Sequence, residues 1–338
     1  MTKLRVITSP EFVTLADEAG VNIPIEQDPI WDKYEEYYQK RQRRSVFFAW
    51  GDRAIVSLRD YKLRNKSILW ARSGPIWFTP PTPTEENALA DALMEYARST
   101  SAIAVRLHAK SVHPKAVPTF YDVAYDTTVF VDLDKPEEQV LADMRKRGRR
   151  DVRKAMRSDI EVREVPLGVF QDRLDDFYEV MGITAKRDSF GALPKERMAA
   201  MMEVLGKAGR QRIFEAHNNG HLVAWASFIT TGDHAQYYTA ATDTTDREGA
   251  ADLVLWEAMK ALRNDGIKQL DLMGIGSDLA PALNSLTTFK KKFAPEPETV
   301  APARDYPVRL GYQIMVIERR GLRWLRQKLQ ATKSRGDS

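Results

Sequence analysis

The chain has 338 residues, with 51 lysines and arginines against 47 aspartates and glutamates, so its formal net charge is +4. It has no cysteine, which excludes disulfides, a thiolate nucleophile and a cysteine-ligated zinc site. The first residues lack the apolar run of a signal peptide, and no stretch reaches the roughly 20 apolar residues that span a bilayer. We therefore expect a cytoplasmic protein, and this length favours two domains over one.

The first third of the chain alternates between helical and strand patterns. A hairpin is predicted around Gly51-Asp52-Arg53, where two short apolar runs flank a turn sequence. The Pro-rich residues 79–83 then lead into an amphipathic helix. The predicted elements in chain order are helices at 12–20 and 31–41, strands at 46–50, 54–58 and 67–71, a helix at 85–99 and a strand at 102–107.

The same order of elements returns later in the chain. After a strand at 128–133, helices are predicted at 174–186 and 195–207, a hairpin at 212–216 and 222–229 across Asn218-Asn219-Gly220, a strand at 235–242, a helix at 246–264 and a strand at 267–272. The helix at 246–264 and the closing strand at 267–272 follow their counterparts at 85–99 and 102–107 by about 165 residues. This repeated order indicates two copies of one unit. A returning strand is expected at 308–317.

This repeat predicts an α/β (α+β) fold of two tandem domains, each a mixed sheet flanked by helices. The first domain would cover residues 1–145 and be completed by 308–338, and the second would cover 146–307. The short helical segment at 195–209 leaves no room for a coiled-coil arm. Each unit has the shape of an N-acyltransferase (GNAT-like) domain, namely helices, three meandering strands, a helix and a strand.

Basic residues are concentrated in two segments. Residues 145–157 hold eight lysines and arginines and one acid, whereas residues 319–335 hold seven and no acid. Outside both segments the acids outnumber the bases. Such runs attract polyanions, either nucleic acid or an anionic membrane, although a basic face that only keeps a protein soluble is the simpler interpretation. The first run predicts a polyanion-binding helix, with candidate residues Arg145, Lys146, Arg149, Arg150, Arg153 and Lys154.

Standard catalytic motifs are missing. The sequence has no HExxH, P-loop or G-x-S-x-G motif, and its five histidines lack ligand spacing, so we expect no metal site. Acyltransferases that use coenzyme A bind its pyrophosphate at a glycine-rich turn before the helix of each unit. The turn Arg247-Glu248-Gly249-Ala250-Ala251 matches weakly, because an acid would face the anion. Coenzyme A is therefore not the expected donor, and no cofactor is expected.

An ordered set of short motifs resembles the FemABX family of peptidyltransferases, from about residue 27 to residue 293. The motifs are Gln27-Asp28-Pro29-x-Trp31, Ser73-Gly74-Pro75, Lys146-x-x-x-x-Asp151-x-x-x-Lys154-Ala155, Thr184-Ala185-Lys186-Arg187-Asp188, Asp271-Leu272-x-Gly274-Ile275 and Phe289-Lys290-x-x-Phe293. The resemblance implies twin acyltransferase-like domains. It also implies transfer of an amino acid from aminoacyl-tRNA, as co-substrate, to a side-chain amine of a peptidoglycan precursor, which builds an interpeptide bridge.

The resemblance also implies site residues. Phe289 and Lys290 would act on the reacting ester, with Lys290 supplying positive charge to the developing oxyanion or leaving oxygen. Trp31, Tyr34, Arg187, Tyr237, Tyr238 and Asp271 would bind substrate, most of them along an acceptor groove between the domains. The basic helix at 145–157 would contact tRNA. An ordinary amphipathic turn remains the alternative interpretation of Phe289-Lys290-Lys291-Lys292-Phe293.

The chain departs from the family where nucleotide-linked precursors bind. Relatives that use UDP-MurNAc-pentapeptide carry a lysine four residues after the N-terminal tryptophan, where this chain has Glu35. The acceptor could therefore be lipid-linked (lipid II) or nucleotide-linked. The alternative functions are an acyl-CoA N-acyltransferase, a peptide-forming enzyme of secondary metabolism and a non-catalytic binding protein. We expect a monomer, and the C-terminal basic helix is a candidate contact with the inner membrane surface.

Overall fold

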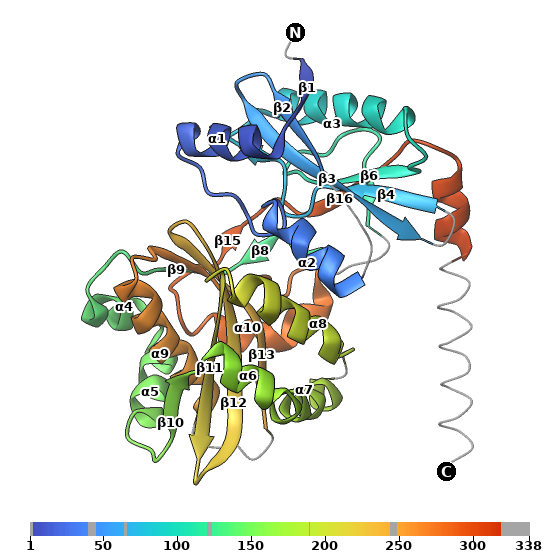
Figure 1. Cartoon of the computed structure of the whole chain (residues 1–338). Coiled ribbons are helices and arrows are strands. Elements are labelled where there is room, and N and C mark those ends of the chain that lie inside the picture. The colour runs from blue at the N-terminus through green and yellow to red at the C-terminus, as the bar shows by residue number, and fades with distance from the viewer. Residues whose placement is uncertain are drawn as a thin grey trace. The chain divides into compact units, whose positions relative to one another are not determined.

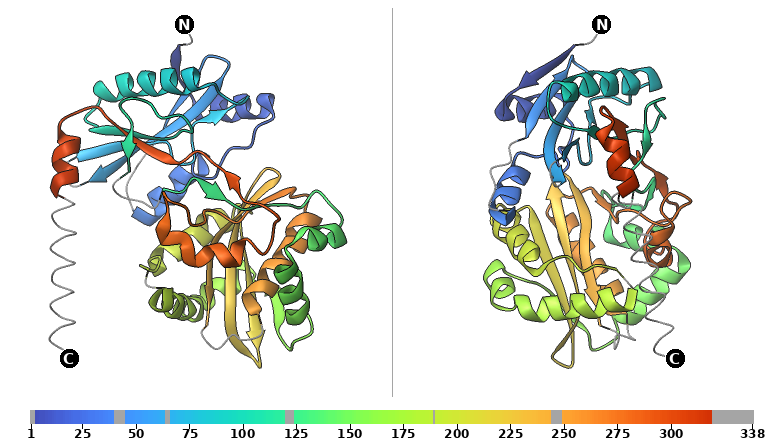
Figure 2. Two further views of the ribbon diagram at one scale, coloured as in Figure 1. Left: turned by 180° about the vertical axis from the view of Figure 1, so that it is seen from behind. Right: turned by 90° about the vertical axis from the view of Figure 1, so that its right-hand side faces the viewer.

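The computed structural model describes residues 3–39, 45–63, 66–119, 124–188, 190–243 and 249–318. The chain divides into two compact units (Figure 1). Unit 1 comprises Met1–Leu15, Arg44–Asp122 and Pro302–Ser338, and unit 2 comprises Ala16–Arg43 and Val123–Ala301. Each unit has its own sheet, and helices cover both faces of each sheet (Figure 2).

Unit 1 contains a sheet of eight described strands in the order β1-β2-β3-β4-β6-β16-β7, with β5 beside β3. The strands are β1 (Leu4–Ile7), β2 (Val46–Trp50), β3 (Ala54–Leu63), β4 (Lys66–Trp70), β5 (Ile76–Trp77), β6 (Ala104–His108), β7 (Val117–Pro118) and β16 (Ala303–Pro307). Phe47 and Phe48 point to opposite faces because side chains alternate along a strand. Phe47 meets Phe12 of α1 (Ser9–Ala19), whereas Phe48 meets Tyr96 of α3 (Pro83–Arg98).

Helix α3 begins at Pro83, two residues before the start predicted from the sequence. The Thr82 hydroxyl accepts a hydrogen bond from the Glu85 backbone N–H, the Glu85 carboxylate accepts one from the Thr82 N–H, and Pro83 stands at the first helical position. The apolar face of α3 is buried through Leu89, Leu93 and Ala97. This packing carries the chain back over the sheet, so that β6 pairs with β4 in parallel.

Unit 2 contains a six-stranded sheet in the order β10-β11-β12-β13-β14-β9. The strands are β9 (Phe130–Asp132), β10 (Glu161–Glu164), β11 (Gln211–Asn218), β12 (His221–Thr231), β13 (His234–Thr242) and β14 (Gln269–Asp271), and a separate pair joins β8 (Thr127–Thr128) to β15 (Glu298–Thr299). The predicted hairpin turn is confirmed, since Asn219 and Gly220 both have positive φ, as a two-residue hairpin of this twist requires.

Helices pack on both faces of the unit 2 sheet. They are α2 (Ile30–Gln39), α4 (Glu137–Asp143), α5 (Lys146–Ala155), α6 (Leu167–Asp172), α7 (Leu174–Asp188), α8 (Lys195–Met201), α9 (Ala250–Asn264) and α10 (Asn284–Lys290), with a short π-helix η1 (Met202–Gly206) and a 3₁₀ helix η2 (Pro281–Leu283). Phe214 of β11 packs in the core with α5 and α9, whereas its neighbour Ile213 packs in the core with α6 and α7. The alternation of one strand therefore builds two cores.

The repeat predicted from the sequence is confirmed. In each unit an antiparallel meander leads into a long helix (α3 or α9) and then a strand that pairs in parallel with the last strand of the meander. This is the tandem acyltransferase-like architecture. In the described residues after α7, α8 has only seven residues and η1 five, so no coiled-coil arm extends there.

Two boundaries differ from the sequence interpretation. The returning strand is β16 at Ala303–Pro307 rather than 308–317, and residues 311–318 are helical. The burial explains the difference, because Tyr312 and Met315 are buried at helical spacing whereas Ile314 and Ile317 are exposed. The domain boundary also differs from the predicted 1–145, because residues 16–43 and 123–145 group with unit 2. Helix α2 packs against α8 and η1, and β9 pairs with β14 in the unit 2 sheet. The expected basic helix after residue 320 lies outside the described residues.

No helix in the described part of the chain is long and apolar enough to cross a membrane.

Candidate active site

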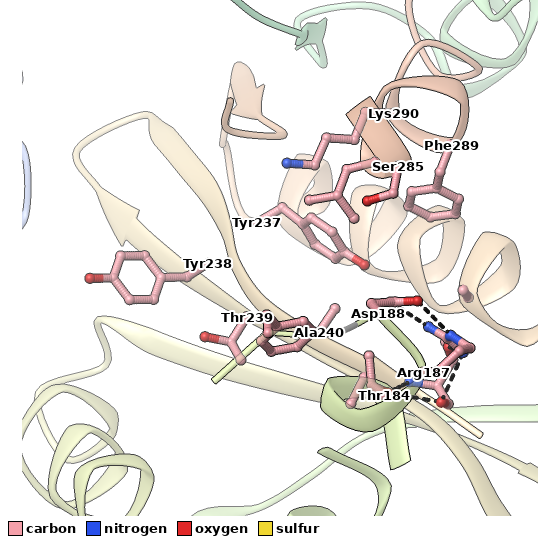
Figure 3. A pocket seen from close by; sticks show the side chains of 15 residues that line it. Thr184, Arg187, Asp188, Tyr237, Tyr238, Thr239, Ala240, Ser285, Phe289 and Lys290 are labelled. Carbon is pink, nitrogen blue, oxygen red and sulfur yellow. Dashed lines mark hydrogen bonds and ion pairs between the residues drawn. The ribbon is translucent and has the colours of Figure 1, made fainter. Parts of the chain in front are cut away.

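A pocket of about 390 Å³ opens in unit 2 where two parallel strands separate (Figure 3). Strands β13 and β14 pair only as far as Gln236 and Asp271. Beyond that point, the rest of β13 lines the pocket together with residues from α7, α9 and α10. The lining residues are Thr184, Arg187, Asp188, Phe190, Tyr237, Tyr238, Thr239, Ala240, Ala241, Thr242, Ala251, Ser285, Leu286, Phe289 and Lys290.

Lys290 is the buried cation of this pocket. It is the last residue of α10 and is only 6% exposed. Its Nζ donates to the Gly274 carbonyl oxygen at 2.8 Å and to the Met273 carbonyl oxygen at 3.2 Å. Burial lowers the pKa of Lys290 from 10.5 to about 8, and the charge of Asp271 partly opposes this shift. The site therefore holds an ammonium that is poised to lose its proton just above neutral pH.

The turn after β14 provides the partners of Lys290. Met273 has φ of +62°, a left-handed conformation that a non-glycine residue rarely adopts. Its N–H donates to Asp271 Oδ1 at 2.7 Å, while its carbonyl oxygen accepts from Lys290. Gly274 follows, and a Cβ there would lie 2.4 Å from the Tyr125 ring, so no larger residue fits without movement. This strained turn aims two carbonyl groups at one ammonium.

Asp271 lies beneath this turn. Its Oδ1 accepts hydrogen bonds from the Thr128 hydroxyl at 2.5 Å and from the Met273 N–H. Burial raises the pKa of the Asp271 carboxyl, and both hydrogen bonds act in the opposite direction. Asp271 does not line the pocket, so its contacts support the turn that holds Lys290.

Aromatic rings form the wall beside Lys290. The Phe289 ring lies 6.5 Å from the Tyr237 ring and 5.3 Å from the Phe293 ring, measured between centroids. Burial raises the pKa of the Tyr237 hydroxyl well above its usual range, so it stays protonated as a donor. Tyr238 also lines the pocket, and its hydroxyl donates to Glu26 Oε1 at 3.2 Å.

Arg187 and Asp188 line another part of the pocket. The Arg187 guanidinium donates to both carboxylate oxygens of Asp188 and to the Thr242 hydroxyl at the end of β13. This hydrogen bonding lowers the pKa of the Asp188 carboxyl, which stays ionised. The Thr184 hydroxyl donates a hydrogen bond to the Thr242 carbonyl oxygen and accepts one from the Thr242 N–H. The end of α7 is thus fastened to β13, with a charged pair at the pocket wall.

Trp31 and Tyr34 lie elsewhere in unit 2. Both belong to α2, have no exposed surface and pack with Met201 and Leu205. The Tyr34 hydroxyl accepts a hydrogen bond from Arg197 at 2.7 Å, and neither ring lines the pocket. The structure therefore places Lys290, Phe289, Arg187 and Tyr237 around one pocket and Trp31 and Tyr34 in the core. Tyr238 also lines the pocket, but its ring packs against the core cluster of Trp31 and Tyr34 (Figure 3).

The predicted polyanion-binding residues divide into two groups on α5. Arg145 donates to the Pro295 carbonyl oxygen and Arg149 to the carbonyl oxygens of Ala142 and Met144, so both side chains hold the backbone. The side chains of Lys146, Arg150, Arg153 and Lys154 are exposed, and Arg150 pairs with Asp151. A contiguous basic surface therefore remains on the solvent side of the helix.

Sequence reasoning missed three parts of the site. The carbonyl groups of residues 273 and 274 carry no side-chain signal, and the glycines at 274 and 276 are the one feature of the sequence that could have pointed to a tight turn there. Thr128 is 143 positions from its partner Asp271. Asp188 belongs to one of the sequence motifs, but its ion pair with Arg187 at the pocket wall was not predicted.

Two family models match the chain. One is the FemAB family, over residues 72–196, and the other is an acetyltransferase (GNAT) domain, over residues 143–289. No curated protein sequence matches it significantly.

Solved structures share the fold of the whole chain. A crystal structure of FemX aligns with a TM-score of 0.71 at 15% identity, covering 93% of this chain and 100% of that one. A tandem GNAT protein from the clavulanic acid biosynthesis pathway gives 0.52 at 10% identity, with 91% and 99% covered. The structure of L-PGS from Bacillus licheniformis aligns with a TM-score of 0.50 at 13% identity, covering 88% of this chain and 98% of that one. The FemAB match and the tandem fold make the chain similar to the FemABX family, and together with the acetyltransferase (GNAT) match they indicate that it is an acyltransferase.

Proposed function

We propose that this protein transfers an amino acid from aminoacyl-tRNA to a side-chain amine of a peptidoglycan precursor. The observation that carries the proposal is the buried ammonium of Lys290, held by two carbonyl groups at the edge of a pocket that Phe289 also lines. The FemAB match and the FemX-like fold support the choice of reaction.

The reaction is the aminolysis of an ester. The acceptor amine attacks the ester carbonyl carbon, a C–N bond forms, and the C–O bond to the tRNA ribose breaks, while one proton passes from the attacking nitrogen to the leaving ribose oxygen. An ammonium has three N–H donors, and the carbonyl oxygens of Met273 and Gly274 occupy two of those of Lys290. The third can donate to the developing oxyanion or to the leaving ribose oxygen. A charged donor in a largely buried site stabilises such charge strongly.

The exposed basic side of α5 is suited to the donor's phosphates. Lys146, Arg153 and Lys154 are exposed there. The last turn of α5 lies beside the start of α9, because a Cβ on Gly249 would be 3.5 Å from the Ala155 Cβ. Two residues further on, Ala251 lines the pocket. A nucleic acid bound along α5 would thus have its end near the pocket.

Coenzyme A is the rival acyl donor, and the GNAT match favours it. Asp252, at the third position of α9, opposes it, because a carboxylate at a helix N-terminus competes with a phosphate for the same positive field. The Asp252 carboxylate is paired with Lys292. Calorimetric binding of coenzyme A would favour this second function, including an enzyme of secondary metabolism.

The acceptor can be lipid-linked or nucleotide-linked. Glu35, which replaces the lysine of nucleotide-using relatives, is buried and accepts hydrogen bonds from Trp31 Nε1 at 3.2 Å and Gln39 Nε2 at 2.6 Å. A buried carboxylate does not bind phosphate, so the contact that nucleotide-using relatives make at this position is lost, and a lipid-linked acceptor stands beside the nucleotide-linked one. A lipid-linked acceptor would bring the enzyme to the membrane surface, with the C-terminal basic segment as the proposed contact.

One assay tests the proposal. The protein is incubated with a charged tRNA pool and either lipid II or UDP-MurNAc-pentapeptide, and the acceptor is analysed by mass spectrometry. We expect the mass of one amino acid to be added in at least one arm. A parallel reaction replaces the charged tRNA with acetyl-CoA. Acetyl transfer in that reaction, with no amino acid added in either tRNA arm, would reject the proposal.

A further inference from the structure

Lys292 is a second buried lysine close to the pocket. It is 9% exposed, and its ammonium contacts two carboxylates from different helices. One is Asp151 of α5, with Nζ to Oδ2 at 3.3 Å, and the other is Asp252 of α9. The same ammonium lies 5.2 Å from the ring centroid of Phe289 and 5.9 Å from that of Phe293. One charge therefore joins α5, α9 and the reacting end of α10.

The backbone at Lys292 is held just as closely. Its carbonyl oxygen accepts a hydrogen bond from the Arg145 N–H at 3.0 Å, at the start of α5. A Cβ on Gly148 would lie 2.3 Å from that oxygen, so α5 approaches more closely than any side chain there would allow. The Arg145 guanidinium also donates to the Pro295 carbonyl oxygen at 2.7 Å.

Lys290 is connected to Lys292 by a tight turn. The Lys292 N–H donates to the Phe289 carbonyl oxygen at 3.1 Å, and the Phe293 N–H donates to that of Lys290 at 3.1 Å. A displacement of Lys292 must therefore be transmitted to Lys290 through two peptide units. The Asp151 carboxylate also meets Arg147 and Arg150, so the basic side of α5 shares this charge network.

We propose that Lys292 is a positioning residue that locks the basic helix α5 and the start of α9 to the reacting end of α10. This inference rests on the proposed function for its kinetic consequence. The buried charges of Lys292 and Asp252 and the partly exposed charge of Asp151 hold a geometry that well-packed apolar side chains would hold at least as stably. Such networks are retained in some proteins because they specify one arrangement. Here the arrangement that is specified is the place of Lys290 and Phe289 beside the pocket.

The test compares Lys292→Met with Lys291→Met, the same change one residue earlier. The Lys291 side chain is partly exposed and makes no ion pair or hydrogen bond within the described part of the chain. We expect Lys292→Met to lower kcat about tenfold or more, because small misplacements of a reacting group cost this much, with little change in the KM for aminoacyl-tRNA. Lys291→Met should stay within about twofold of the unmodified enzyme. Lys292→Arg should restore part of the loss, since it keeps the charge.

A second measurement does not depend on transfer. Amine-selective labelling as a function of pH, read at Lys290 by mass spectrometry, reports how that ammonium is held. We expect Lys292→Met to move the labelling midpoint of Lys290 and Lys291→Met to leave it unchanged. If Lys292→Met does not fold, Asp151→Asn, at a partly exposed carboxylate, should produce the same change to a smaller extent.

The outcomes separate the two claims. If the unmodified enzyme transfers no amino acid but Lys292→Met shifts Lys290 labelling, the proposed function fails and the positioning role stands. If the unmodified enzyme is active while Lys292→Met matches Lys291→Met in both kcat and labelling, the positioning role is refuted.

Discussion

Replacing Lys290 with methionine should separate activity from stability. The pKa difference between 10.5 and about 8 corresponds to a cost of about 3 kcal/mol for burying the charged form, present at pH values below 8. The unfolded chain binds the proton more tightly, so the stability of the unmodified protein should rise as the pH increases from about 8 towards 10.5. Methionine removes this cost but leaves the carbonyl groups of Met273 and Gly274 without this donor, at about 1 kcal/mol each. The net gain at pH 7 should be about 1 kcal/mol.

The same substitution should nearly abolish transfer. Removing one donor to an oxyanion typically lowers kcat about 100- to 1,000-fold. The assay is single-turnover transfer from charged tRNA, with urea unfolding at pH 7 on the same preparations. In the unmodified enzyme the rate should fall as the pH rises through about 8, because Lys290 then loses its proton.

Two results would refute this reasoning. Transfer within tenfold of the unmodified rate would mean that Lys290 does not stabilise the reacting ester. A loss of more than about 2 kcal/mol of unfolding free energy would mean that its charge stabilises the fold, contrary to the direction of its pKa. Lys291→Met serves as the control, since it removes a neighbouring lysine outside the pocket lining.

Three further substitutions test other parts of the structure. Gly274→Ala should destabilise the protein by about 1–3 kcal/mol and slow transfer, because its Cβ would clash with Tyr125; an unchanged melting temperature would contradict this packing. Arg153→Ala should weaken tRNA binding and reduce the slope of log affinity against log salt by about 1, as filter binding at several salt concentrations can show; an unchanged slope would remove this residue from the interface. Asp305→Ala should cost about 3–5 kcal/mol, because it removes the carboxylate that pairs with the buried Arg106; denaturant unfolding measures this, and a cost below about 1 kcal/mol would contradict it.

The sequence was most informative where one local signal and one packing requirement agree. The turn at Asn219-Gly220 and the Pro-rich residues 79–83 each predicted a boundary to within about two residues, because short-range chemistry decides both. The strand predicted at 308–317 was wrong. The apolar residues there fit the periodicity of a strand or of a helix, and the burial of Tyr312 and Met315 selects the helix. Local signals cannot resolve such a segment without its packing partner.

The candidate site was predictable in its side chains but not in its backbone. Phe289 and Lys290 came from a motif, and the structure places both at the pocket. The partners of Lys290 are carbonyl groups, which every residue has, so no sequence pattern can single them out. Trp31 came from a motif too, yet it is buried in the core, because a residue type reports chemistry and not location.

Strand β16 has a consequence for how the protein is made. It lies between β6 and β7, and its Asp305 pairs with Arg106, which is 199 positions earlier in the chain. During synthesis, the sheet of unit 1 cannot be completed until the ribosome has translated unit 2 and then β16. Only then can the buried Arg106 pair with Asp305. Pairing across such a sequence distance is slow, and the open edge of β6 is exposed meanwhile. Nascent chains stalled before residue 303 should therefore depend on chaperones, whereas chains released after residue 307 can close the sheet.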